Sequence, residues 1–265
     1  MTTEPRNQLT MGRGARTPRR PDAAGRGVRT PRRPDAAGRA ALAAYAEQSA
    51  AVRLHARVRW YSAPFPAIAG VLPDTGRVLE IGCGHGLFSV YVALASGARA
   101  VRGVDIDQHK IAVAQVVAGR VDADLEFDVT PSGAVGPGPW DAIVVVDMLY
   151  LLPAAQQQQL LTEAAGGLGP GGCLVIKEMS RTPRWKAAWN TAQETLAVSI
   201  LGITERAAAA PGPAAGGRLA LATFDFVAPE TMAGWLADAG LDISSHRLDR
   251  GRIHPHHLLI GRRPG

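Results

Sequence analysis

Cysteine is scarce in this chain, and long apolar runs are absent. The 265 residues include only two cysteines, Cys83 and Cys173, which form no CxxC or Cys/His spacing. This usage argues against a disulfide framework and a zinc site, and it is typical of free thiols in a reducing compartment. The most apolar stretch, residues 143–152, contains Asp147 and is far shorter than the roughly 20 residues of a membrane span. We therefore expect a cytoplasmic protein with no membrane span.

Acidic residues are few near the N-terminus, where the positive charge of the chain is concentrated. Residues 1–40 contain ten arginines and three acidic residues, which amounts to +7 of a chain total of +6. Residues 41–265 therefore carry a net charge of −1 and offer no broad basic surface. This distribution makes a nucleic-acid partner an unfavoured interpretation. The arginine pairs at 19–20 and 32–33 precede no long apolar segment, so no export signal is expected.

The basic segment contains a tandem duplication. The sequence RTPRRPDAAGR occurs at 16–26 and again at 29–39, and it contains no apolar cluster. A segment rich in Pro, Gly and Arg cannot offset its chain entropy by burial, so we expect residues 1–40 to be a disordered arm. The arm could contact an anionic surface, or it could be a duplicated linker or an upstream start ahead of Met11.

Residues 41–265 alternate between helical and β-branched patterns. A helix is predicted from Ala41 to the prolines at 64 and 66, because apolar residues recur there at a spacing near 3.6. The segments predicted after it are strand 77–81, helix 87–96, strand 100–105, helix 108–118, strands 124–128 and 141–146, helix 154–166 and strand 172–178. This alternation, with continuous Val/Ile strands, is typical of a parallel sheet covered on both faces.

The C-terminal region departs from this alternation. A helix is predicted over 229–240, followed by strands over 241–249 and 256–261. A short turn at Gly251 and Arg252 joins the two strands, so they must be antiparallel.

Three closely spaced glycines stand between the first strand and its helix. Gly82, Gly84 and Gly86 follow strand 77–81 directly. Glycines permit positive φ and a close approach, so a ligand can lie against backbone N–H groups and the helix N-terminus. A plain tight turn would need one glycine rather than three. The spacing therefore predicts a nucleotide-like cofactor at this turn.

Carboxylates follow the next two predicted strands. Asp105 stands where an acidic side chain can accept hydrogen bonds from both ribose hydroxyls, and Asp107 is the better candidate for the helix cap. Asp128 ends the third strand and could accept from an adenine amino group, although DVTP at 128–131 is equally good turn chemistry.

These segments, in this order, resemble the class I S-adenosylmethionine-dependent methyltransferases over residues 60–262. The matching segments are VLEIGCGHG at 78–86, RGVDID at 102–107, LEFD at 125–128, WDAIVVVDMLYLLP at 140–153, GGCLVIKE at 171–178 and the terminal strand pair. The resemblance implies a Rossmann-like α/β fold with a seven-stranded sheet of order 3-2-1-4-5-7-6, strand seven antiparallel, and helices on both faces. It also implies methyl transfer from S-adenosylmethionine to a small metabolite, as in bacterial enzymes of secondary metabolism.

The resemblance also suggests how the cofactor is held. It implies that Glu80 and the glycine backbone hold the methionine part, Asp105 the ribose and Asp128 the adenine. The full set of residues expected at the cofactor is Glu80, Gly82, Cys83, Gly84, Gly86, Asp105, Ile106, Asp128, Val129 and Asp147.

The expected catalytic residues are His254, His256 and Tyr150. A general base helps if the acceptor is a hydroxyl, whereas alignment can suffice for an amine or an enolate-like carbon. A histidine at the turn of the terminal hairpin would titrate near working pH. Tyr150 follows strand 141–146, with a packing role as the alternative. A metal held by the histidines is not expected, because His256 and His257 point to opposite faces and no carboxylate completes the set.

Residues 182–217 are predicted to be a helical insertion. Its apolar face includes Trp185, Trp189 and Leu196, which could cover an apolar substrate or simply pack on the core. The acceptor atom and the oligomeric state stay open.

Features of the sequence oppose three other function classes. A nicotinamide-dependent oxidoreductase is opposed by the GxGxG spacing, which is followed by Leu87, and by the antiparallel end of the sheet. A nucleic-acid methyltransferase is opposed by DMLY at 147–150, which lacks the Asn/Asp-Pro-Pro-aromatic element that grips a flipped base. A non-enzymatic binding module is opposed by the presence of Glu80, Asp105 and Asp128 together.

Overall fold

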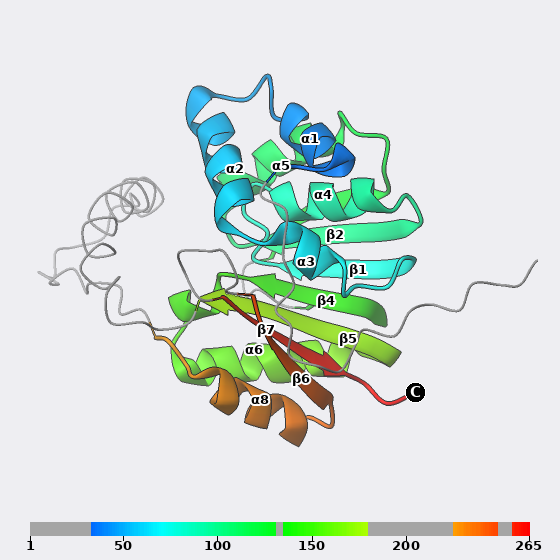
Figure 1. The fold of residues 1–265 in the computed structure, drawn as a ribbon, viewed down its shortest axis with the longest axis vertical. Coiled ribbons are helices and arrows are strands. Elements are labelled where there is room, and N and C mark those ends of the chain that lie inside the picture. The colour runs from blue at the N-terminus through cyan, green and yellow to red at the C-terminus, as the bar shows by residue number, and fades with distance from the viewer. Residues whose placement is uncertain (1–32, 131–134, 180–224, 249–255) are drawn as a thin grey trace, which may run out of the picture.

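The computed structural model describes residues 33–130, 135–179, 225–248 and 256–265, which form one mixed sheet with helices on both faces (Figure 1). The strands are β1 (Gly76–Ile81), β2 (Arg99–Asp105), β3 (Leu125–Val129), β4 (Trp140–Val146), β5 (Leu168–Met179), β6 (Asp242–Arg247) and β7 (His256–Arg262). Their order is β3-β2-β1-β4-β5-β7-β6, and β7 runs antiparallel to both of its neighbours. The predicted fold class and strand order are confirmed.

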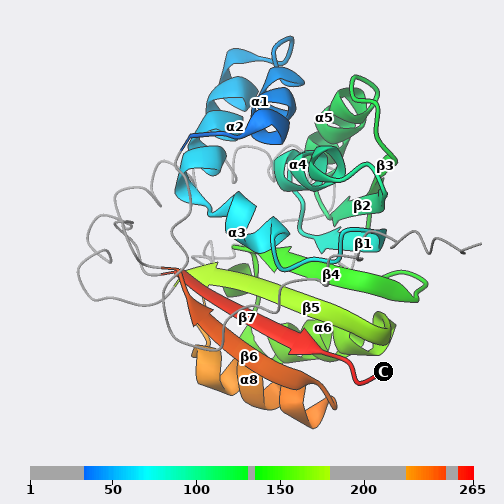
Figure 2. The ribbon, with the colours of Figure 1, turned by 45° about the vertical axis from the view of Figure 1, so that its right-hand side comes forward.

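The helices form two layers around this sheet (Figures 1 and 2). They are α1 (Ala36–Ala43), α2 (Ala50–Ser62), α3 (Phe65–Ala69), α4 (Leu87–Ala95), α5 (Gln108–Ala118), α6 (Ala154–Gly167) and α8 (Pro229–Asp238), with a 3₁₀ turn η1 over Leu149–Leu151. Alternate strand residues point to opposite faces, so Val78 packs with the helices α1–α5 while Leu79 packs with α6 and α8. The core therefore consists of two apolar layers, one on each face of the sheet.

The N-terminal helix differs from its prediction in two ways. It is two helices, and Ser49 caps the second by accepting a hydrogen bond from the backbone N–H of Val52. The first begins at Ala36, because the Asp35 side chain accepts from the backbone N–H of Gly38. The expectation of disorder was therefore wrong for residues 36–40. Residues 1–32 of the predicted arm, and the predicted insertion 182–217, lie outside the described residues.

Within the described ranges, no helix is both long and apolar enough to span a membrane.

Candidate functional site

The glycine turn joins β1 to α4, and its three glycines all have positive φ. The values are 74° at Gly82, 57° at Gly84 and 82° at Gly86, in the region where side chains with a Cβ are strained. A Cβ on Gly86 would collide with the ring of Phe127, whereas one on Gly84 would meet no atom within 4 Å. Gly86 thus allows close packing on β3, and Gly84 leaves an open face on the turn.

The first turn of α4 follows directly. Gly86 is its N-cap, and no side chain caps the helix there. The unpaired N–H groups of a helix start form a partial positive charge that favours an anionic or polar ligand. The glycine turn and the start of α4 together offer backbone donors to such a ligand.

Asp105, at the end of β2, holds the glycine turn. Its Oδ2 accepts from the backbone N–H of Gly84 at 2.8 Å, and its Oδ1 accepts from the N–H of Asp107 at 2.9 Å. Asp107 caps α5 by accepting from the N–H groups of His109 and Lys110, as predicted. Each carboxylate oxygen has a second lone pair, so Asp105 can still accept hydroxyl groups of a ligand.

The other residues expected near the adenosine are exposed. Asp128 accepts from Arg102 Nε through Oδ2 at 2.7 Å, which leaves Oδ1 for a further donor. Ile106 is 67% exposed and Val129 is 41% exposed, so both side chains are accessible to a ligand. Their role in binding stays a prediction.

Glu80 lies beneath the glycine turn, buried and facing α4. It accepts from Ser89 Oγ at 2.5 Å. Burial raises the pKa of its carboxyl to about 7, against the opposing effect of the Ser89 bond. Cys83 is buried beside it, and burial followed by the charge of Glu80 raises the pKa of its thiol. This thiol is therefore protonated at neutral pH.

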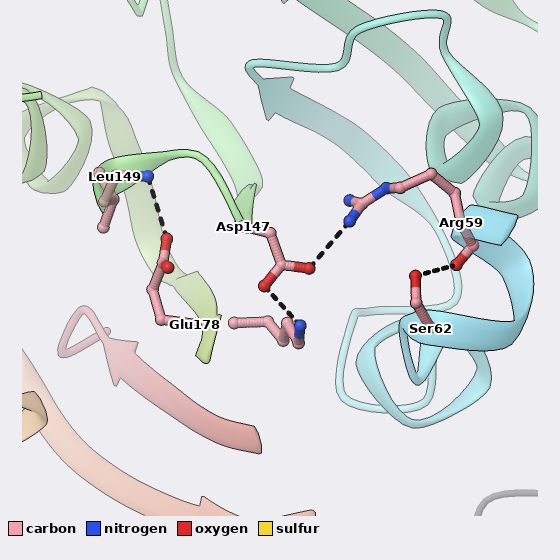
Figure 3. A network of polar contacts seen from close by, with 6 residues as sticks. Arg59, Ser62, Asp147, Leu149 and Glu178 are labelled. Atoms are coloured by element: carbon pink, nitrogen blue, oxygen red, sulfur yellow. Dashed lines mark hydrogen bonds and ion pairs between the residues drawn. The ribbon is translucent and has the colours of Figure 1, made fainter. Parts of the chain in front are cut away.

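Asp147 stands at the centre of a buried ionic network at the carboxyl ends of β4 and β5 (Figure 3). Its Oδ1 accepts from Lys177 Nζ at 2.5 Å, and its Oδ2 accepts from Arg59 Nη1 at 2.9 Å. Burial disfavours the charged carboxylate, but Lys177 and then Arg59 outweigh it and hold the pKa of Asp147 below its usual range. Asp147 is thus a buried anion between two cations. The sequence predicted Asp147 at the pocket but did not predict these two partners.

Glu178 follows Lys177 on β5 and binds the same loop from the other side. Its Oε1 accepts from the backbone N–H of Leu149 at 3.0 Å (Figure 3). Burial, and then the nearby charge of Asp147, raise the pKa of Glu178 to about 8. This side chain is therefore mostly a neutral acid at pH 7.

Sequence reasoning missed Arg59, Lys177 and Glu178. One signal was available for the last two, since a Lys-Glu pair ends the apolar run CLVI of a strand predicted to be buried on both faces. Charged residues at such positions are almost never buried unless they are paired, so the Lys-Glu pair indicates that groups able to pair with it lie nearby.

Tyr150 packs against Phe226, with the two rings stacked at a centroid distance of 5.3 Å. Burial, followed by the charges of Asp147 and Glu178, raises the pKa of its hydroxyl. Such a hydroxyl stays protonated at neutral pH and suits a hydrogen-bond donor better than a base.

The predicted histidines are only partly placed. His254 lies outside the described residues, and His256 is described by its backbone alone, which pairs with Met179 at the carboxyl end of β5. Their catalytic role stays a prediction. Across the described part of the chain, no three His, Cys, Asp or Glu side chains gather as a metal site.

A histidine pair lies above the glycine turn instead. The rings of His55 on α2 and His85 in the turn are 4.9 Å apart and meet edge to face. Burial first, then the charges of His85 and Arg59, lower the pKa of His55 to about 4. In addition, Tyr45 donates to the backbone oxygen of His85 at 2.6 Å. These contacts tie the N-terminal helices to the turn.

Comparison with known proteins finds similarity to methyltransferases in both sequence and structure. A family model described as a methyltransferase domain matches residues 53–246. A ubiquinone biosynthesis O-methyltransferase from Xanthomonas euvesicatoria is 27% identical over 63% of this chain and 63% of its own length. The chain thus spans slightly less than two thirds of that relative.

Two solved structures share the fold. An O-methyltransferase family protein from Burkholderia thailandensis has a TM-score of 0.55 at 19% identity, covering 83% of this chain and 62% of that one. A magnesium protoporphyrin IX methyltransferase from Synechocystis, with bound S-adenosylhomocysteine, has a TM-score of 0.54 at 19% identity, covering 83% and 91%.

Proposed function

The chain belongs to the methyltransferase domain family, and from this premise we propose that it transfers the methyl group of S-adenosylmethionine to a small metabolite. The observation that carries the proposal is the joint presence of the open glycine turn and Asp105 bonded to it at Gly84. A cofactor with an adenosine and an amino-acid end needs both backbone donors and a carboxylate next to them.

The chain offers a group for each part of that cofactor. Asp105 would accept the ribose hydroxyls, and Asp128 Oδ1 would accept from the adenine. Arg59 would hold the carboxylate of the amino-acid end, since its guanidinium has five N–H donors and its side chain is 29% exposed beside Asp147. S-adenosylmethionine itself supplies an electrophilic methyl group, so the protein has to align an acceptor and exclude water.

An oxygen acceptor is favoured by the relatives named O-methyltransferase. For a hydroxyl acceptor, His256 remains the proposed base because its backbone position is at the carboxyl edge of the sheet. Tyr150, with its raised pKa, would donate a hydrogen bond to the acceptor.

We propose that the reaction takes place in the cytoplasm, which fits two buried cysteines that are both free thiols.

Calorimetry with S-adenosylmethionine tests the proposal. We expect binding to the wild type and at least about tenfold weaker binding to Asp105→Ala, which corresponds to roughly 1.4 kcal/mol. Asp107→Ala is the matched control, since it removes the helix cap two residues away and leaves the glycine turn bonded. Equal affinity of wild type and Asp105→Ala would refute the role of Asp105. Binding of NADH in place of S-adenosylmethionine would favour the oxidoreductase alternative.

A further inference from the structure

Two consecutive residues of β5, Lys177 and Glu178, form hydrogen bonds with the loop after β4. Side chains of neighbouring strand residues point to opposite faces of a sheet. Lys177 lies on the face of α1–α5, in phase with Cys173 and Val175 of that apolar layer. Glu178 lies on the face of α6 and α8, where it lines a small cavity with Gln157 and Met232. The two side chains nevertheless bind residues of one loop.

The Lys177 contact fixes the start of this loop through both main chain and side chain. The β4–β5 register sets Val146 opposite Lys177, and the next N–H, that of Asp147, donates to the Lys177 oxygen at 2.9 Å. Lys177 Nζ in turn donates to Asp147 Oδ1. Asp147 has a φ of 53°, the sole positive value at a non-glycine residue of the described ranges. A residue in this disfavoured region persists only where its surroundings hold it.

The Glu178 contact fixes the loop two residues later. Its carboxyl accepts from the backbone N–H of Leu149, the first residue of η1, whose side chain is completely buried. This acceptor satisfies a donor that would otherwise be unpaired in the protein interior. The acceptor oxygen is present in both protonation states of the carboxyl.

Met148, between the two fixed residues, packs on the glycine turn. A Cβ on Gly82 would lie 2.8 Å from Met148 Cγ, so the side chain rests against Gly82 where β1 ends. A shift of residues 147–149 would therefore move the surface that meets the turn.

We propose that Lys177 and Glu178 are positioning residues that clamp residues 147–149 and so fix Met148 against the glycine turn at the cofactor site. The contacts of the clamp are structural observations, while its effect on the cofactor rests on the proposed function.

The first test follows Met148 without any ligand. The chain has five methionines, and their ¹³C-labelled methyl signals can be assigned with Met148→Leu. In Glu178→Ala we expect the Met148 signal to shift or broaden, while Glu178→Gln, which keeps an acceptor for Leu149, retains the wild-type signal. The second contact is removed by Lys177→Leu combined with Asp147→Asn, which leaves no unpaired carboxylate and should also disturb Met148. Glu163→Ala is the control, because this exposed carboxylate of α6 accepts from Gln159 of the same helix, away from residues 147–149.

The second test measures the affinity for S-adenosylhomocysteine by calorimetry. We expect about tenfold weaker binding to Glu178→Ala and to the double variant, and a change of less than about threefold in Glu178→Gln and Glu163→Ala. An unchanged Met148 signal in both disrupted variants, or Glu178→Gln as damaging as Glu178→Ala, would overturn the clamp. Failure of the wild type to bind S-adenosylhomocysteine would refute the proposed function, and the Met148 signals would still decide whether the clamp exists.

Discussion

Gly84 and Gly86 have similar backbone conformations but different surroundings. Both have positive φ, yet only Gly86 is closed in, by the ring of Phe127. One glycine thus serves the fold and the other leaves room for a ligand. Close packing requires glycine at position 86, whereas room for a ligand requires it at position 84.

Alanine at each position should separate these roles. Gly84→Ala should lose about 1–2 kcal/mol of unfolding free energy from strain alone. Gly86→Ala adds the collision with Phe127 and should lose about 2–4 kcal/mol. Urea unfolding measures both. Calorimetry should then show that Gly84→Ala, the more stable variant, still loses affinity for S-adenosylhomocysteine. Equal losses of stability in the two variants would contradict this assignment.

The roles of single residues were predictable where the contacts are local. Asp107 could be assigned as a cap because its partners, His109 and Lys110, are two and three positions away. The partners of Asp147 could not, because Arg59 and Lys177 come from other elements and meet it only after the sheet has formed. Sequence patterns specify which side chains are buried more readily than which distant groups they meet.

At the scale of elements, helix starts decide where the N-terminal region becomes ordered. The composition of residues 1–40 predicts disorder, but Asp35 caps α1 and its Oδ2 also accepts from Tyr91 on α4. The close fit of Gly38 on Trp60 of α2 adds to this anchoring, since no larger residue would fit there. Tertiary contacts outweighed composition. In the sheet, by contrast, buried Val/Ile runs made the strands predictable to within a few residues.

Removal of this cap should cost measurable stability. Asp35→Ala loses the bond from the N–H of Gly38 as well as that from Tyr91, and caps of this kind contribute about 1 kcal/mol. Tyr91→Phe removes only the second bond and isolates its share. Urea unfolding should rank the wild type above Tyr91→Phe and Tyr91→Phe above Asp35→Ala. A value for Asp35→Ala equal to the wild type would mean that α1 is not anchored through its cap.

At the scale of the whole molecule, the buried carboxyl of Glu80 makes stability depend on pH. Burial raises the pKa of this carboxyl to about 7 in the folded chain, from an ordinary value of 4.5. Between these values the folded protein keeps a proton that the unfolded chain has released. The free energy of unfolding contributed by this group is therefore fully present below pH 4.5 and is lost as pH rises to 7.

Glu80→Gln should remove this dependence, because a carboxamide stays neutral while its oxygen can still accept from Ser89. Relative to the wild type, the variant should gain unfolding free energy as pH rises from 4.5 to 7, by on the order of 3 kcal/mol in total. Urea unfolding of both proteins at several pH values without ligand gives this difference, in which the contributions of His55 and Glu178 cancel. A difference that stays constant with pH would contradict the buried, protonated state of Glu80.

The position of β7 has a consequence for the order of assembly. β6 joins the sheet only through β7, which lies between β5 and β6 although it follows both in the sequence. One edge of β5 therefore stays unpaired until residues 256–262 form their hydrogen bonds with it, and β6 cannot join the sheet before then. Pairings between segments distant in sequence are slow to form, because the chain between them must first be closed into a loop. We therefore expect strands β1–β4 to pair first and the part of the sheet formed by β5, β7 and β6 to form last.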